Sequence, residues 1–480
     1  MDNTGEKGIA KTEGNRLKVG MISLGCAKNR VDSEIMLGLI KNAGYDIVGE
    51  CENADIVVVN TCGFIESSKQ EAIDTVLEVA ELKKSGSLKG IVVAGCLAQR
   101  YGREIAEYIP EADAVVGAFG YSNVCDAIES IAKKKKTVLS DDPENVKAAE
   151  KSRSICYFDD REITDLDYLD GERVLTTPKS YAYLKIAEGC SNRCTYCAIP
   201  AIRGVYRSRP VKKLLEEASR LAGAGIKEIV VVAQDTTMYG TDIAGKPLLP
   251  ELLRVIDEIP GIEFVRILYL YPDEITEEIL DAIGSCKKVV PYFDIPLQHI
   301  NDGVLKRMNR RGNGALYREV IRKLRERIPG CVIRTSLITG FPGETEEEHR
   351  ELVQFLRETK LERVGVFMYS KEDGTPAAKM KNQIHPSTKK RRYNELMAVQ
   401  QNVSYEFNNS RVGRVFPVIV DSVSEDGIFY VGRSFMEAPE EDGNVFFAAK
   451  EEHSVGDIVN VKILVAEEYD VTGEETGKSD

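Results

Sequence analysis

Short apolar segments alternate with amphipathic ones in the first third of the chain. Three segments are apolar and rich in β-branched residues, which is typical of buried parallel strands: residues 18–24, 55–60 and 90–94. Two segments between them have helical periodicity: residues 32–43 and 66–82. Asp32 or Ser33 is placed to cap the first helix. This order predicts an open parallel α/β sheet over residues 16–140.

A polar stretch interrupts the alternation, which then resumes at Tyr181. Residues 141–180 lack apolar periodicity and are predicted to form a linker with room for one or two strands. Six strand candidates follow: residues 181–187, 228–234, 264–271, 292–298, 331–340 and 363–370. Amphipathic segments such as 211–224, 248–259 and 345–360 separate most of them. Six units are fewer than the eight that close a barrel, so an incomplete (βα)6 barrel is expected over residues 181–400.

The last part of the chain has a different pattern. Residues 387–409 are expected to form one connecting helix. Four short strand candidates then lie between Gly-, Asp-, Asn- and Glu-containing turns: residues 415–423, 427–435, 444–450 and 457–469. They predict a small, OB-like antiparallel β-barrel over residues 401–470.

Composition narrows the class of protein. The chain has 480 residues and a net charge of -13, which disfavours broad, non-specific binding to nucleic acids. The polar start does not resemble a signal peptide, and no apolar run approaches a membrane span, so a cytoplasmic protein without membrane contact is expected. The thiols of a cytoplasmic protein stay reduced, so clustered cysteines among the 11 are candidate metal ligands.

Three cysteines lie close together directly after the first strand of the central region. Cys190, Cys194 and Cys197 have the spacing C-x3-C-x2-C. Three thiolates from one loop can hold three corners of a 4Fe-4S cluster and leave the fourth iron open. A structural zinc site would need a fourth ligand, but the next candidates are the distant Cys286 and His299. The loop therefore favours a chemically active cluster.

Three other cysteines follow the three predicted strands of the first region. Cys26, Cys62 and Cys96 each lie one to three residues beyond a strand end, in the segments SLGC, VNTC and VAGC. Loops at the carboxyl ends of parallel strands converge on one crevice, so these thiols are expected to meet. Chance placement is the alternative, but the other five cysteines show no such regularity. The pattern predicts a second metal site.

Polar and glycine residues end two strands of the predicted barrel. Gln234 and Asp235 end the second strand, and the turn with Gly340, Gly343 and Glu344 ends the fifth. These positions lie on the catalytic rim, where they could contact a cofactor, although the turn could equally be a plain turn and helix cap.

Basic residues and one histidine near this rim are less informative. Arg203, Arg207 and Arg209 could neutralise a carboxylate or phosphate, or form a solvated basic loop. His299 is interpreted as a structural residue because a lone histidine is usually hydrogen-bonded in a core.

The C-x3-C-x2-C loop, with Tyr196 just before its last cysteine, resembles the signature of the radical S-adenosylmethionine superfamily. The resemblance implies that the open iron binds S-adenosylmethionine and that Tyr196 belongs to the cofactor site. It also implies cleavage of the cofactor to methionine and a 5′-deoxyadenosyl radical. The incomplete barrel agrees with the fold of that superfamily.

The whole arrangement resembles the methylthiotransferases over about residues 16–470. This resemblance implies that Cys26, Cys62 and Cys96 hold a second 4Fe-4S cluster, the auxiliary cluster, which carries sulfur. It implies that the terminal barrel is a TRAM domain that recognises the substrate, and that two S-adenosylmethionine molecules are used per turnover. No catalytic residue beyond the cluster ligands is implied.

Two motifs favour one branch of this family. SLGCAKNRVDSE from Ser23 and YFDIPLQH from Tyr292 resemble the branch that methylthiolates the β-carbon of an aspartate in the twelfth protein of the small ribosomal subunit. Ala27 departs from the proline that this branch often has there. Residues 411–480 contain 6 Lys+Arg and 16 Asp+Glu, a net charge of -10, which suits a basic protein partner better than transfer RNA.

Two alternatives remain at this point. A transfer-RNA adenosine methylthiotransferase would share every cysteine and differ in what its terminal barrel holds. A non-catalytic iron-sulfur electron carrier or sensor would not cleave S-adenosylmethionine. No motif indicates the sulfur donor or the electron donor.

Overall fold

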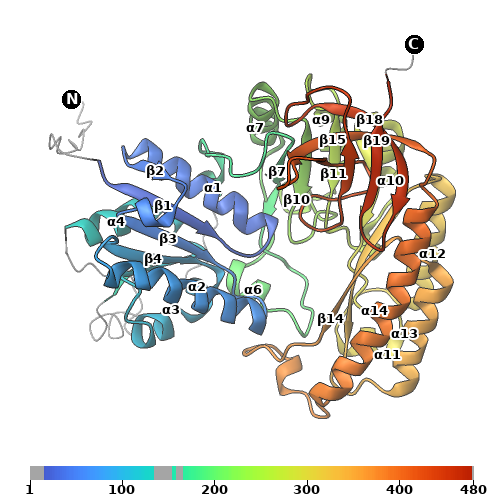
Figure 1. Ribbon diagram of the computed structural model, residues 1–480. Coiled ribbons are helices and arrows are strands. Elements are labelled where there is room, and N and C mark those ends of the chain that lie inside the picture. Colours follow the sequence, from blue (N-terminus) through green and yellow to red (C-terminus); the bar gives the residue numbers. More distant parts are fainter. Residues whose placement is uncertain (1–15, 134–153, 158–165, 478–480) are drawn as a thin grey trace.

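The computed structural model describes residues 16–133, 154–157 and 166–477. An N-terminal sheet with its helices, a central curved sheet and a C-terminal barrel follow one another along the chain, and the C-terminal barrel lies over one end of the central sheet (Figure 1).

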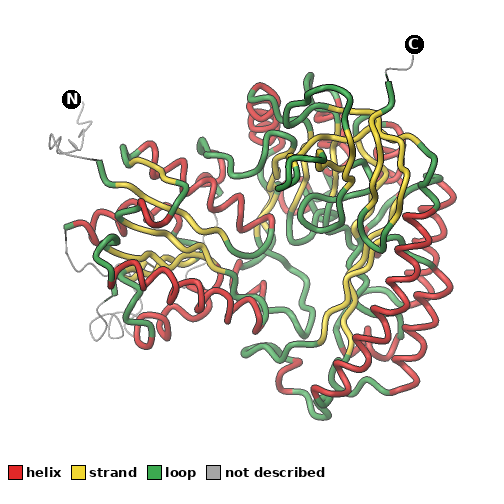
Figure 2. The backbone as a smooth tube through the Cα atoms, viewed as in Figure 1, coloured by secondary structure: helices red, strands yellow, loops and turns green. Residues whose placement is uncertain are grey.

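The N-terminal unit is an open sheet in which every neighbouring pair of strands is parallel. Its strands, in spatial order, are β2 (Asp46–Val48), β1 (Lys18–Ser23), β3 (Ile56–Thr61), β4 (Gly90–Gly95), β5 (Ala114–Gly117) and β6 (Ile155–Tyr157). Its α-helices are α1 (Ala27–Asn42), α2 (Glu66–Lys84), α3 (Cys96–Tyr108) and α4 (Val124–Ala132). The helices cover both faces of the sheet (Figure 2), which explains why β3 and β4 are buried at every position. The predicted parallel sheet is confirmed.

The predicted linker contributes to this sheet. Strand β6 pairs with β5 at one edge, although its residues lie within the segment 141–180. Residues 141–153 and 158–165 of that segment lie outside the described residues.

The start of α1 differs from the prediction. The helix begins at Ala27, directly after Cys26, and the amides of Asn29 and Arg30 both donate to the carbonyl of Cys26. Asp32 and Ser33 are therefore inside the helix and fully buried, so neither is a cap. The prediction was wrong because Asp32 pairs with Lys185 and Arg203 across the domain boundary, and Ser33 bonds to Ser23 and Asn60 inside the N-terminal unit, so neither side chain serves the helix terminus.

The central unit is the incomplete six-stranded barrel that the sequence predicts. Its parallel strands, in spatial order, are β14 (Arg363–Met368), β13 (Val332–Thr339), β12 (Val289–Asp294), β11 (Phe264–Ile267), β10 (Glu228–Val232) and β7 (Tyr181–Lys185). Its longer helices are α7 (Val211–Gly223), α9 (Leu249–Asp257), α10 (Glu277–Ser285), α12 (Gly314–Arg327) and α13 (Glu346–Thr359). Shorter elements are β8 (Ala187–Glu188), α6 (Ile199–Arg203), β9 (Arg207–Ser208), α8 (Thr241–Ala244) and α11 (Asp302–Arg307).

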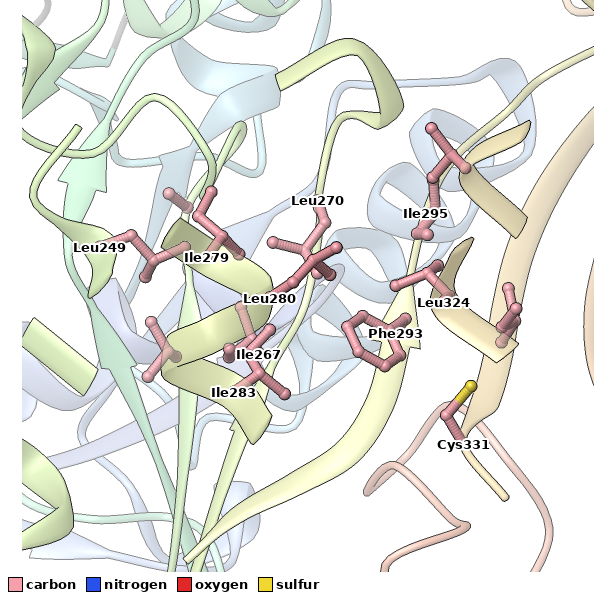
Figure 3. Packing of buried hydrophobic residues seen from close by; sticks show 14 of the residues in the cluster. Leu249, Ile267, Leu270, Ile279, Leu280, Ile283, Phe293, Ile295, Leu324 and Cys331 are labelled. Carbon is pink, nitrogen blue, oxygen red and sulfur yellow. The ribbon is translucent and has the colours of Figure 1, made fainter. Parts of the chain in front are cut away.

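One hydrophobic core joins these helices to the strands. Leu280 and Ile283 of α10 pack near Ile267 of β11, and Leu324 of α12 lies by Phe293 of β12 (Figure 3). Cys331 is also part of this core, away from both cysteine triads. Fully burying side chains of this size contributes about 1.5–3 kcal/mol each, which makes the barrel a rigid support for its rim loops.

Helix α14 (Pro386–Asn409) leads into a closed five-stranded barrel. Its strands, in spatial order, are β15 (Val415–Val423), β16 (Tyr430–Arg433), β17 (Val445–Ala448), β19 (Val471–Glu475) and β18 (Ile458–Ala466). The prediction of an entirely antiparallel barrel needs one correction, because β17 and β19 run parallel where the barrel closes. The short, polar strand β19 carries no apolar alternation and was missed.

Charged side chains, some of them buried, hold the C-terminal barrel to the rest of the chain. Arg266 of β11 pairs with Glu228 at 2.7 Å and donates to the carbonyl of Phe435 at 2.8 Å. Glu440 accepts from the hydroxyl of Tyr181 at 3.0 Å and pairs with Arg30 of α1 at 2.8 Å. The barrel therefore contacts both preceding units. A helix able to cross a bilayer is not found in the part of the chain that the structure describes.

Glu437 is the acidic centre of this attachment, and its neutralisation should destabilise the fold. Its carboxylate accepts from Arg411 at 2.6 Å and Arg363 at 3.0 Å. Burial opposes its ionisation, but the two guanidinium charges more than offset burial and lower the pKa of Glu437 to about 2. Glu437→Gln leaves both buried arginines without their carboxylate, so we expect a loss of about 3 kcal/mol in unfolding free energy at neutral pH, measured by urea denaturation.

The stabilisation by Glu437 should depend on pH, because its carboxyl must be ionised to pair with the arginines. A carboxyl whose pKa is lowered by folding stabilises the protein above its unfolded pKa of about 4.3. The stability difference between wild type and Glu437→Gln should therefore shrink as the pH falls from about 4 through 2. Exposed Glu425 on the same barrel provides the control Glu425→Gln, which should be neutral. Equal stability of the two variants at pH 7 would contradict the prediction.

Candidate cluster-binding sites

The first triad lies at the carboxyl edge of the N-terminal sheet. Cys26 lies three residues beyond β1, Cys62 directly follows β3, and Cys96 follows β4 as the first residue of α3. Cys26 is exposed, Cys62 is partly buried and Cys96 is buried. The three cysteines therefore follow neighbouring strand ends at one edge of the sheet, and their exposure decreases from Cys26 to Cys96.

Two glycines bring these loops into contact. A Cβ on Gly25 would lie 2.8 Å from the Cβ and 3.2 Å from the Sγ of Cys62. A Cβ on Gly63 would lie 2.8 Å from the backbone of Leu97, next to Cys96. Residues beside Cys26 and Cys62 therefore have no room for a side chain, and the three cysteine loops pack directly against one another.

Two asparagines fasten the same loops. Asn29 donates to the carbonyl of Leu24 at 2.6 Å, and Asn60 donates to the carbonyl of Asn29 at 2.9 Å and to the hydroxyl of Ser33 at 2.7 Å. Both asparagines are buried. Sequence reasoning missed them, although Asn60 gives a usable signal: it is a polar residue at the end of an apolar run, two residues before Cys62.

The thiols of this triad are close enough to influence one another's ionisation. Burial raises the pKa of Cys96 to about 12, the guanidinium of Arg203 opposes this rise, and Cys62 and Cys26 add to it. Burial and the proximity of Cys26 also raise the pKa of Cys62. Cys26 thus disfavours ionisation of Cys62, and both of them disfavour ionisation of Cys96. A cationic metal centre would remove this repulsion.

The second triad lies in a loop that leaves β8 and enters α6. The amide of Cys190 donates to the carbonyl of Gly204, and the amide of Ile199 donates to Cys197 Sγ at 3.4 Å. Cys190 and Cys194 are buried, and Cys197 is partly buried. Arg310 places Nη1 3.9 Å from Cys194 Sγ. The loop is therefore held by its own backbone and by one buried arginine that sequence reasoning did not identify.

The side chains predicted at the end of β10 support this loop. Asp235 accepts from Asn192 at 2.7 Å and from Thr237 at 2.5 Å, and burial raises the pKa of Asp235. Gln234 donates to Glu188 at 2.9 Å, while its buried Oε1 has no hydrogen-bond partner among the described residues. Gln234 therefore keeps an acceptor for a bound group, whereas Asp235 is occupied with positioning the cysteine loop.

Tyr196 packs beside the second triad against a small apolar cluster that includes Met308 and Phe341. Burial raises the pKa of Tyr196 well above its ordinary value, and Cys194 adds to this effect. The neutral ring forms an apolar wall next to Cys194.

The predicted turn after β13 is built around Glu344. Its carboxylate accepts from the amides of Gly340 at 2.6 Å and Phe341 at 3.0 Å, and it pairs with Arg392 at 3.0 Å. Gly340 and Gly343 both have φ of 74°, which favours glycine. The carboxylate of Glu344 is engaged within the protein, so a ligand at this turn would meet its backbone.

The three arginines after the second triad do not form a solvated loop. Arg203 and Arg209 are 2% and 1% exposed, and Arg207 is partly buried. Arg209 pairs with Glu217 and Asp170, and Arg203 pairs with Asp32 and Glu188. Arg203 and Arg209 therefore neutralise carboxylates of the protein itself, whereas Arg207 donates to the backbone carbonyl of Arg203 at 3.0 Å.

His299 is a core residue, as predicted. It is fully buried, and its Nδ1 accepts from the amide of Asn301 at 3.0 Å. Burial, with His349 and neighbouring arginines, lowers the pKa of His299 to about 3, so the ring is neutral.

Each triad offers three thiols, which is the donor set of a cubane cluster with one open iron. No group of three or more His, Cys, Asp or Glu side chains within the described ranges converges as the ligands of one metal ion do. A cubane binds each thiolate to a different iron, so its ligand sulfurs lie further apart than those around one ion. Each triad also has an arginine directed at one sulfur, which suits the negative charge of a thiolate-bound cluster.

Family models match each of the three units. Residues 18–117 match the uncharacterized protein family UPF0004, residues 184–356 match the radical SAM superfamily, and residues 412–475 match the TRAM domain. Among solved structures, the radical S-adenosylmethionine methyltransferase TsrM from Kitasatospora setae is similar in fold, with a TM-score of 0.53 and 15% identity over 80% of this chain and 89% of that one.

Two curated relatives are similar over almost their whole length. The ribosomal protein uS12 methylthiotransferase RimO of Acetivibrio thermocellus is 48% identical over 96% of this chain and 99% of the relative. The protein of the same name from Lachnoclostridium phytofermentans is 48% identical over 95% and 99%. The incomplete barrel with its C-x3-C-x2-C loop, together with the matching model, defines a radical S-adenosylmethionine enzyme. More narrowly, the chain belongs to the RimO family of methylthiotransferases.

Proposed function

We propose that this enzyme attaches a methylthio group to the β-carbon of an aspartate in ribosomal protein uS12. The single observation that carries the proposal is the pair of cysteine triads, one on each side of the boundary between the N-terminal sheet and the barrel, in a chain of the RimO family. Bound there, two 4Fe-4S clusters and S-adenosylmethionine supply a radical that breaks an unactivated C–H bond and the sulfur that replaces the hydrogen.

The residues divide the work between two sites. Cys190, Cys194 and Cys197 would hold the radical-generating cluster, and Cys26, Cys62 and Cys96 would hold the auxiliary cluster. Tyr196, Gln234, Gly340 and Gly343 would border the S-adenosylmethionine, while Asp235 and Glu344 keep their loops in place. Burial of Cys96, Cys190 and Cys194 restricts water near the point where a carbon radical must meet sulfur before any other partner.

The charge of the C-terminal barrel supports a basic protein as the substrate. Some of its acids serve the fold, since Glu437 and Glu440 pair with arginines or tyrosines of the other units. Others remain exposed: Glu425, Glu451, Glu452, Asp457, Glu467 and Glu474. Exposed carboxylates attract lysine and arginine side chains and repel the phosphates of RNA. A ribosomal protein is a cytoplasmic partner, so we place the reaction in the cytoplasm.

A direct competition tests this proposal. The reconstituted, reduced enzyme is incubated with S-adenosylmethionine, a peptide spanning the target loop of uS12, and transfer RNA in the same tube. We expect the peptide to gain one methylthio group, detected by mass spectrometry with fragmentation at the aspartate, and the RNA to stay unmodified. Methylthioadenosine in the RNA together with an unmodified peptide would contradict the substrate assignment, and cofactor turnover without modification of either would contradict the transferase assignment.

A further inference from the structure

One arginine touches the auxiliary triad although it comes from the loop of the other triad. Arg203 ends α6, six residues after Cys197. Ile202 of this helix and Ala198 just before it pack against Cys96. Figure 1 shows α6 where the N-terminal unit meets the barrel. A single short segment therefore connects the two candidate cluster sites.

The guanidinium of Arg203 donates two hydrogen bonds to the sulfur of Cys96. Nε lies 3.3 Å and Nη2 lies 3.1 Å from Cys96 Sγ. Arginine presents such paired donors in a fixed plane, and a lysine ammonium does not. The contact is therefore specific to the arginine side chain and not only to its charge.

The remaining donors of Arg203 hold this pair of hydrogen bonds in place. Nη1 donates to Asp32 at 2.7 Å and to Glu188 at 3.1 Å, and Nη2 also donates to Asn29 Oδ1 at 3.1 Å. Asp32 and Asn29 belong to α1, which begins directly after Cys26, and Glu188 lies two residues before Cys190. The arginine thus binds segments adjacent to both triads.

The surrounding charges explain why an arginine is stable in this position. Lys185 and Arg203 face Asp32 and Glu188, and all four side chains are at most 3% exposed. The two positive charges of Lys185 and Arg203 equal the two negative charges of Asp32 and Glu188, so this buried group is neutral without any charge on Cys96. Arg203 can therefore donate to Cys96 while it keeps its ion pairs with Asp32 and Glu188.

We propose that Arg203 is a positioning residue for the auxiliary cluster: its two hydrogen bonds to the Cys96 thiolate raise the reduction potential of that cluster and fix it relative to the radical-generating site. The inference rests on the proposed function, because it assumes that Cys26, Cys62 and Cys96 hold a cluster. Hydrogen bonds to ligand sulfur stabilise the more electron-rich, reduced state, which is the physical reason for the direction of the shift.

The test detects the contact without measuring turnover. Reconstituted full-length enzyme labelled with ¹⁵N-arginine is reduced and studied by pulsed electron paramagnetic resonance, together with the Cys194→Ala chain, in which the auxiliary cluster gives the only signal. We expect a ¹⁵N hyperfine coupling on the auxiliary cluster, its loss in Arg203→Lys, and a shift of that cluster's midpoint potential to lower values in Arg203→Lys.

Arg266→Lys is the matched control, because Arg266 is also buried, pairs with Glu228 and joins two units through the carbonyl of Phe435, but it has no hydrogen bond to a cysteine among the described residues. It should keep both the coupling and the potential. Wild-type enzyme that carries an auxiliary cluster but shows no ¹⁵N coupling would overturn the inference and leave the proposed function standing; this outcome needs no variant to fold. Wild-type enzyme with no auxiliary cluster by iron and sulfide content would overturn both.

Discussion

Cys194→Ala should abolish formation of 5′-deoxyadenosine and, with it, methylthio transfer. The substitution removes one of three thiolates from a buried loop, and two ligands do not hold a cubane with one open iron. Iron content after anaerobic reconstitution should fall by about four atoms per chain. The products are measured by chromatography of the cofactor fragments and by mass spectrometry of the peptide.

The rest of the fold should survive this change, because other residues of the loop are held independently of Cys194. The amide of Thr195 donates to the carbonyl of Met308, and Asn192 donates to Asp235. Cys125→Ala, on α4 and outside both triads, is the matched control and should keep both activities. Undiminished 5′-deoxyadenosine from Cys194→Ala would show that this loop does not hold the radical-generating cluster.

Cys62→Ala should separate the two half-reactions. It removes the middle ligand of the auxiliary triad, so methylthio transfer should be lost while cofactor cleavage stays within about twofold of wild type, since independent sites contribute additively. The readout is the ratio of modified peptide to 5′-deoxyadenosine, which should fall to background.

Each variant should lose one cluster and keep the other. Cys194→Ala should retain the auxiliary cluster and Cys62→Ala should retain the other, which spectra of each reduced protein can establish. Loss of both activities in Cys62→Ala would mean that the sites are not separable or that the fold depends on the metal. The contact of Arg203 with Cys96 makes this a demanding test, because it joins the two sites physically.

The elements of the fold were largely predictable from the sequence because their signals are local. Apolar β-branched runs such as the one in β3 mark buried parallel strands, and the six strands of the barrel follow from the same pattern. Strand β19 escaped because Val471–Glu475 is short and polar, and its pairing with β17 depends on barrel closure rather than on its own residues.

Both triads were also found from the sequence, since their spacing and their place after strand ends are properties of the chain alone. Cys190, Cys194 and Cys197 lie in one loop, and the carboxyl ends of parallel strands necessarily share an edge, which gathers Cys26, Cys62 and Cys96. The order of elements and the identity of the thiols are therefore what the sequence by itself determined.

Only the tertiary structure decided which polar residues serve these thiols. Asp32 resembled a helix cap and Arg203 resembled part of a basic loop, yet both are buried in contact with each other across the domain boundary. The sequence around a charged residue looks the same whether that residue faces water or another unit of the protein. The partners of Arg203 lie 171 and 107 positions away along the chain, at Asp32 and Cys96, and only folding brings them together.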